Sequence, residues 1–486
     1  TEKVALRINT SYHSEGSFQD AGFKKSFFIS PALVYEVNDK LTFDFLAEIL
    51  ELDRAVAPIF FHSDRESPLP FKTVGELNLD NDLSFTSNDL NIKNPRFNLQ
   101  GQMRYKISDV WTSQTVISRG ATRADGYYGY IYGEAPDGNG FVQEIHKENQ
   151  NTNTFDLQQN FNGDFHIGTL RNRVLIGLDY FNRKVVDNGS GYGTMRYVSP
   201  QGEITYPTGA LPVYTTKASV DSLLAGSGSV NTKINNSAYS AYASDVINFT
   251  EGLSLMASLR ADYYVSEGNV NDDEDDYDQF TLSPKFGLVY QPILNKLSVF
   301  GNYMNAFFNV APRANAVGVV QSFKPEHANQ YEFGVKANVF NDKLSATVSY
   351  YNIEVKNRVY SDPAGNSFQG GKVGSEGFEI DLNANPVGGL NLIAGFSHNH
   401  SEVFEGNNTT FDFYNGEDRA QDGQGPEDLA NIWATYTFQR GDLKDFGFGV
   451  GGNYAGVYKV IDNSATGVFE LPSYTLLNAS LFYNAQ

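Results

Sequence analysis

The chain has 486 residues, no cysteine and a formal net charge of −21. Without cysteine it forms neither disulfides nor thiolate metal sites. Its acidic charge argues against nucleic acid as a partner, because nucleic-acid binding needs a basic face. A soluble chain of this length needs two or more domains, yet no Pro/Gly-rich linker or change of composition divides this one.

Aromatic residues are frequent in a chain that is polar on average. They make up 14% of the residues, while the mean hydropathy is only −0.37. No apolar run approaches the roughly 18 residues that a membrane-spanning helix requires. A transmembrane β-barrel needs strands of only about 9–11 residues with alternate residues apolar, and it carries aromatic girdles around a wet lumen. The composition therefore fits such a barrel.

Apolar and polar residues alternate along most of the chain, which predicts β-strands. Phe43, Phe45 and Ala47, for example, alternate with Asp44 and Leu46. Successive strand side chains point to opposite faces, so one face becomes lipid-compatible and the other water-compatible. Several segments are far longer than the 5–6 residues usual in soluble sheets. The pattern predicts about 18 strands, at residues 3–15, 21–37, 40–52, 91–107, 110–122, 152–163, 169–187, 236–249, 252–267, 278–291, 296–308, 327–340, 343–357, 371–385, 389–404, 426–439, 444–459 and 469–484.

Connections between these strands alternate between tight and long. Tight reversals occur at residues 37–40, 107–109 and 340–343. Long polar stretches occur at residues 53–90, 123–150, 188–235 and 402–428. Outer-membrane barrels have short turns on one side of the membrane and long loops on the other. The rhythm predicts an all-β fold, a large antiparallel transmembrane β-barrel whose apolar faces, with Phe43, Val335 and Phe448, turn toward lipid.

Four short segments in the second half of the chain carry a family resemblance. Residues 323–336 read FKPEHANQYEFGVK, residues 375–382 read SEGFEIDL, and WATYTF at 433–438 and LPSYT at 471–475 follow in that order. Together they resemble strands of TonB-dependent outer-membrane receptors, in particular of the ferric-siderophore branch that takes hydroxamates such as ferrichrome. The resemblance is strongest from about residue 280 to 484.

This resemblance implies a fold and a cellular setting. Family members have a 22-stranded barrel filled by an N-terminal plug. We expect residues 1–486 to form the barrel domain, with about 18–19 of those strands, and we expect the plug, the first strand and the last two strands to lie outside this sequence. The resemblance implies a multi-pass barrel in the outer membrane of a Gram-negative bacterium, in contact with its lipid.

The resemblance also implies a function and partners. The expected function is uptake of a ferric siderophore, powered by the TonB–ExbB–ExbD complex of the inner membrane. Iron would arrive wrapped in the siderophore, so no cofactor and no protein metal ligands are expected. The chain contains no nucleophile elbow, no phosphate-binding glycine-rich loop and no His-Glu zinc motif, so no enzyme activity is expected.

Three tyrosines are the leading candidates for ligand contact. Tyr128, Tyr130 and Tyr132 share one strand face before a long loop, and the resemblance places pocket tyrosines in this region. Tyrosine offers a large contact area together with a hydroxyl for hydrogen bonding. The alternative is an upper aromatic girdle that faces lipid headgroups.

Three further aromatic residues are weaker candidates. Phe60 and Phe61 resemble a loop position at which family members present a pocket aromatic, and packing inside the loop is the alternative. Tyr192, between Gly191 and Gly193, is a candidate flexible aromatic position. For the cluster Phe411, Phe413 and Tyr414, packing within the loop is favoured.

Two groups of residues invite a metal-site interpretation. The acidic run at 272–278 offers oxygen ligands for a hard cation, but it lacks the pattern of an EF-hand loop, and a solvated loop is favoured. His398 and His400 share a strand face without an apparent third ligand, and a position lining the lumen is favoured for them.

Other functions remain open at this point. A receptor of the same architecture for cobalamin, an oligosaccharide or a peptide is one alternative, although only two Trp are present to stack on sugars. A passive porin or a structural barrel of an envelope complex is another, and a large soluble all-β protein is a third.

Overall fold

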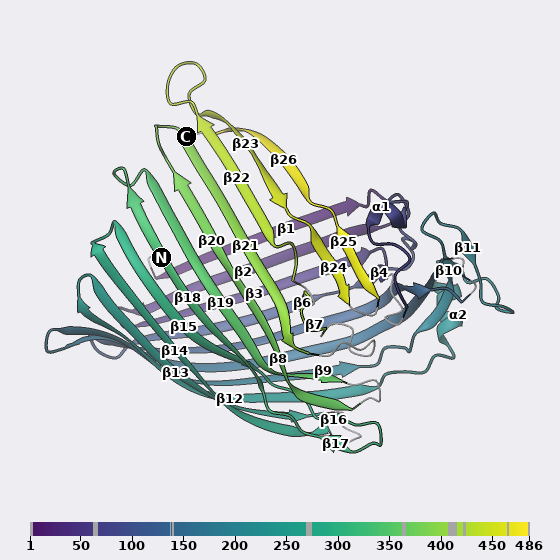
Figure 1. Cartoon of the computed structure of the whole chain (residues 1–486). Helices are drawn as coiled ribbons and strands as arrows, with labels where there is room; N and C mark the ends of the chain where they lie inside the picture. Colours follow the sequence, from purple (N-terminus) through teal and green to yellow (C-terminus); the bar gives the residue numbers. More distant parts are fainter. Residues whose placement is uncertain are drawn as a thin grey trace.

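The computed structural model describes residues 3–61, 67–136, 138, 140–268, 275–361, 366–406, 416–420, 424–463 and 466–484. Within these residues the principal sheet has 22 strands and curves into the wall of a barrel (Figure 1). Its ladders are antiparallel apart from a short parallel pairing of β4 with β7. The predicted all-β barrel is confirmed.

Setting aside the short strands β4, β5, β10 and β11 leaves 18 long strands in the described wall, as the alternation predicts. They are β1 (Val4–Gly16), β2 (Phe23–Asn38), β3 (Leu41–Ala55), β6 (Arg96–Lys106), β7 (Trp111–Glu134), β8 (Phe141–Ile167), β9 (Leu170–Asp187), β12 (Thr232–Thr250), β13 (Leu253–Glu267), β14 (Tyr277–Ile293), β15 (Leu297–Phe308), β18 (Glu326–Val339), β19 (Leu344–Ser361), β20 (Ser367–Ala384), β21 (Leu390–Glu405), β22 (Asp428–Thr437), β23 (Phe446–Ala455) and β26 (Tyr474–Tyr483).

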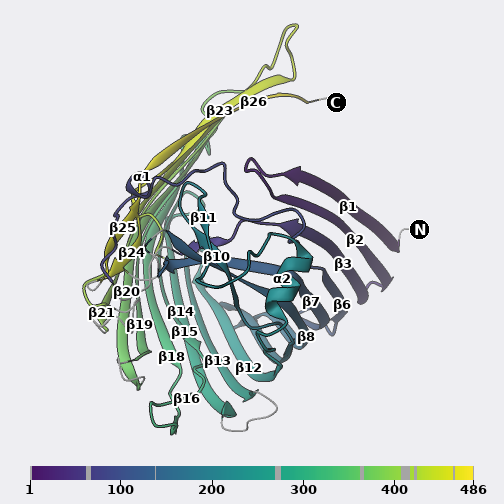
Figure 2. The ribbon, with the colours of Figure 1, turned by 90° about the vertical axis from the view of Figure 1, so that its right-hand side faces the viewer.

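The wall is a meander in which each long strand pairs with its neighbours along the chain. β1 pairs with β2, β2 with β3, and the series continues to β23 and β26. Figure 2 shows β1 and β26 as the two edges of the sheet. Tight turns such as the one after Asn38 join the strands at one end of the barrel.

The long connections gather at the other end of the barrel (Figure 1). They contain α1 (Val74–Leu77), α2 (Lys217–Leu224), β4 (Ile59–Phe61), β5 (Ile92–Lys93), β10 (Gly193–Val198), β11 (Ile204–Thr205), β16 (Arg313–Ala314), β17 (Val320–Gln321), β24 (Tyr458–Asn463) and β25 (Gly467–Leu471). Among the residues described, no helix is long and apolar enough to cross a membrane.

Two strands differ from the prediction in a way that matters for function. The predicted strands at 110–122 and 152–163 extend to Trp111–Glu134 and Phe141–Ile167, so much of the predicted loop at 123–150 is a continuous hairpin. The ladder runs unbroken from Trp111↔Gly163 to Tyr132↔Val142. Charged residues such as Arg123, Asp125, Glu144 and Glu148 interrupt the apolar alternation of this stretch, so the pattern did not mark it as strand.

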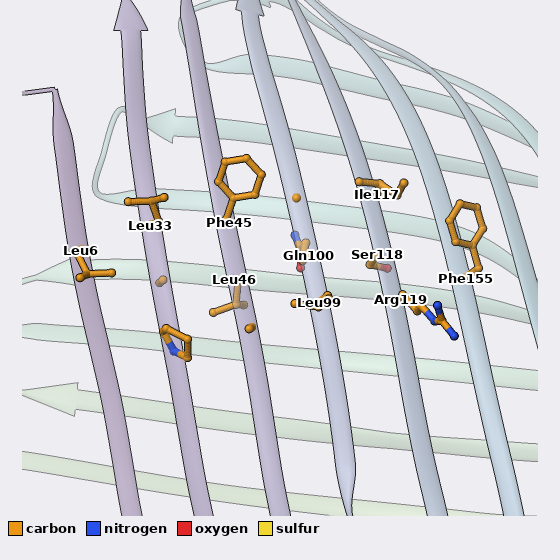
Figure 3. Close-up of a pocket in the computed structure, with 14 residues that line it drawn as sticks. Leu6, Leu33, Phe45, Leu46, Leu99, Gln100, Ile117, Ser118, Arg119 and Phe155 are labelled. Atoms are coloured by element: carbon orange, nitrogen blue, oxygen red, sulfur yellow. The ribbon is translucent and has the colours of Figure 1, made fainter.

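The apolar faces of the wall point outward, as predicted. Val335 pairs with Val348, and Val348 pairs with Ile380 across the next ladder. Val335 and Phe448 are 41% and 40% exposed, so neither lies in a buried core. Figure 3 shows Phe45 and Ile117 on the near side of the strands, with the opposite wall of the barrel behind them.

The opposite face of the wall is polar. Ser240 pairs with Asp262 and with Asp179 across two ladders. The Arg260 Nη2 lies 3.1 Å from the Asp179 Oδ2, and its Nε lies 2.9 Å from the Asp262 Oδ1. Such pairing satisfies charged groups on a partly buried surface, and it gives the lumen the wet face that the sequence predicts.

Candidate ligand-binding site

The hairpin of β7 and β8 rises above the apolar band of the wall. Ile117 of β7 faces outward and pairs with Leu157. Because the ladder continues without a break, Arg119, Arg123 and Asp125 face outward as well, so the outward side chains of β7 change from apolar to charged. The Arg123 Nη2 lies 2.9 Å from the Asp125 Oδ2. Because a charged pair of this kind belongs in water rather than in lipid, the hairpin beyond this level lies outside the membrane.

The three candidate tyrosines occupy the lumen face of this raised hairpin. Tyr128, Tyr130 and Tyr132 have the same parity in β7 as Ser118, which lies on the far side of the strands in Figure 3. Tyr127 and Ile131 have the opposite parity, and both are buried. The tyrosines are therefore not a lipid-facing girdle.

The partner strand adds side chains that the sequence did not single out. Tyr128 pairs with His146, and Tyr130 pairs with Glu144. Strand alternation then puts Glu148 on the same face. Glu144, His146 and Glu148 all lie within the predicted loop at 123–150. The sequence therefore gave no indication of which residues of β7 they would face.

Four rings form one cluster, which we call the aromatic cluster: Tyr128, Tyr130, His146 and Tyr192. The His146 and Tyr192 rings stack with centroids 4.4 Å apart. Tyr130 lies 5.4 Å from Tyr128 and 5.9 Å from Tyr192 by the same measure. Tyr192 is 50% exposed. Two strands and a loop thus bring together three of the predicted residues and one unpredicted histidine.

Two hydrogen bonds between Ser190 and the backbone of Lys147 hold the Tyr192 loop against β8. The Lys147 N–H donates to the Ser190 Oγ at 2.9 Å, and the Ser190 N–H donates to the Lys147 carbonyl at 2.9 Å. Gly191 passes close to the Ser227 carbonyl, where an added Cβ would stand only 2.2 Å from the oxygen. Glycine at 191 therefore allows the chain to deliver Tyr192 to the cluster.

Helix α2 covers the other face of the hairpin. A buried apolar group there consists of Leu90, Tyr127, Ile145, Met195, Val220 and Leu224. The Tyr127 hydroxyl donates to the Asp221 Oδ1 at 2.9 Å, and the Lys147 Nζ lies 3.0 Å from the same oxygen. The hydrogen bond with Asp221 raises the pKa of Lys147. Figure 2 shows α2 in front of β7 and β8, and α2 contacts β8 and β10.

Phe60 lies apart from the aromatic cluster. In the parallel pairing of β4 with β7, Phe60 stands beside Ile131, on the face opposite to Tyr130. Its ring lies 4.9 Å from the Phe141 ring, in a second apolar group with Leu77. Phe60 therefore packs between its own loop and the β7–β8 hairpin, outside the aromatic cluster. The Phe61 side chain lies outside the described residues.

The third predicted tyrosine, Tyr132, lies on the same lumen face as Tyr128 and Tyr130, and it is 37% exposed.

The aromatic cluster has polar atoms with altered acid–base properties. Burial lowers the pKa of the His146 imidazole below its ordinary value of 6.5, so this ring is neutral at pH 7. Burial raises the pKa of Glu148, whose Oε1 lies 3.5 Å from the His146 Nε2. Burial and the neighbouring Tyr130 raise the pKa of Tyr192 to about 12. The site offers aromatic area, hydroxyl groups and carboxylates to a ligand.

The predicted position of the two histidines is wrong. His398 pairs with Phe378, and His400 pairs with Glu376, so both imidazoles share the outward face of β20 and β21 rather than lining the lumen. The His398 Nδ1 lies 2.8 Å from the Asp428 Oδ1. The strand pairing sets this face, and alternation within one strand does not show which side is the lumen.

The remaining metal-site and loop candidates add no site. Residues 272–274 of the acidic run lie outside the described residues, and the Asp276 Oδ1 accepts a hydrogen bond from the Gly268 N–H at 2.7 Å. Phe411, Phe413 and Tyr414 also lie outside the described residues. In the part of the chain that the structure covers, no group of three His, Cys, Asp or Glu side chains is arranged to hold a metal ion.

Comparisons with curated proteins find receptors. The chain is 22% identical to the metal-pseudopaline receptor CntO of Pseudomonas aeruginosa (strain UCBPP-PA14), a match that covers 99% of this chain. It spans only 65% of the length of that receptor. It is 32% identical to the ferrichrome outer membrane transporter/phage receptor of Escherichia coli (strain K12) over 165 residues, which are 33% of this chain and 20% of that protein.

Solved structures share the fold. The ferric preacinetobactin receptor BauA of Acinetobacter baumannii superposes with a TM-score of 0.78 at 16% identity, over 100% of this chain and 69% of that one. The siderophore receptor PiuA of the same organism gives a TM-score of 0.77 at 17% identity, over 100% and 72%.

The family model agrees with the sequence motifs and the architecture. The model described as "TonB dependent receptor-like, beta-barrel" matches residues 48–486. That range contains the raised hairpin, the aromatic cluster and the wall strands from β6 to β26. The chain belongs to the family of TonB-dependent receptors of the outer membrane, and these residues form its β-barrel.

Proposed function

We propose that this chain is the barrel domain of a receptor that takes up a ferric siderophore of the hydroxamate class. The aromatic cluster carries the proposal, because it lies on the lumen face of a hairpin outside the membrane, at the end of the barrel where the long connections gather. The relatives named for ferrichrome and for siderophores support the choice of ligand class.

The chemistry of the cluster suits a chelate that already encloses its metal. Such a ligand presents a large, partly apolar surface with polar edges, and tyrosine contributes both contact area and a hydroxyl. Iron is therefore cargo in this proposal. Transport across the membrane would draw on the TonB–ExbB–ExbD complex, a partner inferred from the family and the resemblance. The proposed activity is transport, without a chemical reaction of the ligand.

The test is uptake of radioactive iron by cells that carry the full-length receptor as their sole siderophore receptor. The double variant Tyr128→Ala/Tyr130→Ala should weaken chelate binding by about 2 kcal/mol or more, as for central aromatic contacts elsewhere. Tyr214→Ala is the matched control, because Tyr214 is 63% exposed in the same long excursion as Tyr192. Uptake without dependence on TonB, or unchanged affinity in the double variant, would contradict the proposal.

A second candidate ligand is a metal–pseudopaline complex. The match to the metal-pseudopaline receptor favours it, because that match covers 99% of this chain. The two candidates separate in one binding experiment with the purified receptor. Ferric trihydroxamate and the metal–pseudopaline complex are titrated in parallel, and the tighter complex identifies the ligand class.

A further inference from the structure

Charged side chains on the raised hairpin are sorted by face. The lumen face of β8 carries Glu144 and Glu148 on either side of His146. The opposite face carries Lys147, which is paired with Asp221. Because these residues alternate along one strand, the chain presents acid toward the lumen and base away from it.

Two other basic groups of this region, Arg196 and Arg123, are also turned away or occupied. Arg196 lies beside Gln143 on the covered face, and its Nε donates to the Gln143 Oε1 at 2.7 Å. Arg123 faces outward with Asp125. Arg54 is the described cation whose charge affects the cluster, since it acts on the pKa of Tyr128 in the downward direction. The Arg54 Nε donates to the Asn94 Oδ1 at 3.2 Å.

Three carboxylates act on the same rings. The negative charges of Glu144 and Glu148 both help to raise the pKa of Tyr192. Asp187 acts on the His146 pKa in the upward direction, against the larger effect of burial. The Asp187 Oδ2 accepts a hydrogen bond from the Gln150 Nε2 at 3.1 Å. The imidazole itself is neutral at pH 7. The described surroundings of the aromatic cluster are therefore acidic.

Rings and carboxylates together recognise cations. A cation binds over an aromatic face when it lies within about 6 Å of the ring centroid, and several rings around one site strengthen the attraction. The Tyr130 and Tyr192 ring centroids lie 5.9 Å apart, and both rings stack against His146. The exposed half of Tyr192 leaves a ring surface open to a ligand.

We propose that the ligand presents a cationic group, such as a primary ammonium, to the aromatic cluster between Glu144, Glu148 and Tyr192. The inference rests on the proposed function and narrows its ligand class to positively charged chelates. The same charge distribution disfavours anionic chelates, since carboxylates at the entrance repel them.

The experiment uses two ferric trihydroxamate chelates that differ at one group. One linear chelate ends in a free ammonium, and the other carries an N-acetyl group at the same nitrogen. Binding to the purified full-length receptor is measured for both. We expect the ammonium form to bind roughly tenfold more tightly, with a preference that weakens as salt increases.

Variants locate the preference on the chain. Glu148→Gln and Glu144→Gln should each reduce the ratio of the two dissociation constants by a factor of about three or more. The N-acetyl chelate is the internal reference, because a general loss of structure weakens the binding of both chelates and leaves the ratio of their dissociation constants unchanged. Glu203→Gln is the matched control, since Glu203 is exposed in the same excursion as Tyr192.

The outcomes distinguish the two proposals. Equal affinity for both chelates in the unaltered receptor overturns the cationic preference and leaves the proposed function in place. A ratio that is unchanged in both glutamine variants also overturns the preference at this site. If neither chelate binds, the proposed uptake of hydroxamates fails, and the inference fails with it.

Discussion

His146 and Tyr192 stack face to face with ring centroids 4.4 Å apart, although they lie 46 positions apart in the sequence. His146 belongs to β8, and Tyr192 belongs to the loop that leads from β9 to β10. Their contact closes the aromatic cluster on its loop side. Ligand capture should therefore depend on the Tyr192 ring more than on its hydroxyl.

Replacing Tyr192 tests this dependence. Tyr192→Ala removes the stacking partner of His146, and we expect the dissociation constant of the bound chelate to rise about two- to thirteenfold, from aromatic-pair energies of about 0.5–1.5 kcal/mol. Tyr192→Phe keeps the ring and should bind nearly as well as the unaltered receptor. Titration of the purified receptor measures both, and equal losses in the two variants would assign the effect to the hydroxyl.

Binding of a cationic chelate should weaken in acid. The pKa of His146 is lowered by burial, so the imidazole is neutral above pH 6.5 and gains a proton only as the pH falls through its lowered pKa. The new positive charge then repels the ligand. We expect constant affinity from pH 8 to about 6.5 and a decline below it, measured by titration at a series of pH values.

His146→Gln supplies the control for this decline, because glutamine does not titrate. Four other charged groups act on the cluster, namely Glu144, Glu148, Asp187 and Arg54. Burial raises the pKa of Glu148, so loss of its charge in acid also weakens cation binding. A decline of the same size and midpoint in His146→Gln would assign it to Glu148 and contradict the role of His146.

The wall of the barrel was predictable from the sequence because its pattern is local. In β3, Phe43, Phe45 and Ala47 face outward and Asp44 faces the lumen, and a two-residue period is enough to place them. Lipid on one side and water on the other impose this period strand after strand. The number of wall strands followed from the same pattern.

The site was predictable only in part, because its geometry depends on long-range pairing. The alternation correctly put Tyr128 and Tyr130 on one face, yet nothing local paired Tyr128 with His146. Phe60 turned to the opposite face because β4 pairs with β7 in parallel, beside Ile131. Register between distant segments decides such contacts.

Asp221 ties α2 to the hairpin and should control the mobility of the Tyr192 loop. Its Oδ1 accepts from the Tyr127 hydroxyl and lies 3.0 Å from the Lys147 Nζ. Both ionic side chains are partly exposed, at 48% and 42%, so the contribution is modest. Asp221→Ala should lower the local opening free energy of residues 188–231 by about 1–2 kcal/mol.

Hydrogen exchange of the full-length receptor measures this opening. Faster exchange in residues 188–231, with unchanged exchange in the wall strands, is the expected result. Asp442→Ala makes the same chemical change in an exposed turn at the other end of the wall and should leave the loop unaffected. Equal exchange in Asp221→Ala and in the unaltered receptor would show that the apolar packing of α2 alone holds the loop.

Two adjacent residues of β19 test which face of the wall meets lipid. Val348 pairs with Val335 and Ile380 on the outward face, whereas Thr347 pairs with Lys336 and Asp381 on the lumen face. A lysine that faces the middle of the bilayer costs about 2–4 kcal/mol, and one in the lumen costs far less. Val348→Lys should therefore reduce the amount of folded receptor in the outer membrane, and Thr347→Lys should preserve it. The heat-modifiable mobility of the folded protein on gels measures that amount, and a loss in Thr347→Lys with a normal level in Val348→Lys would reverse the assigned faces.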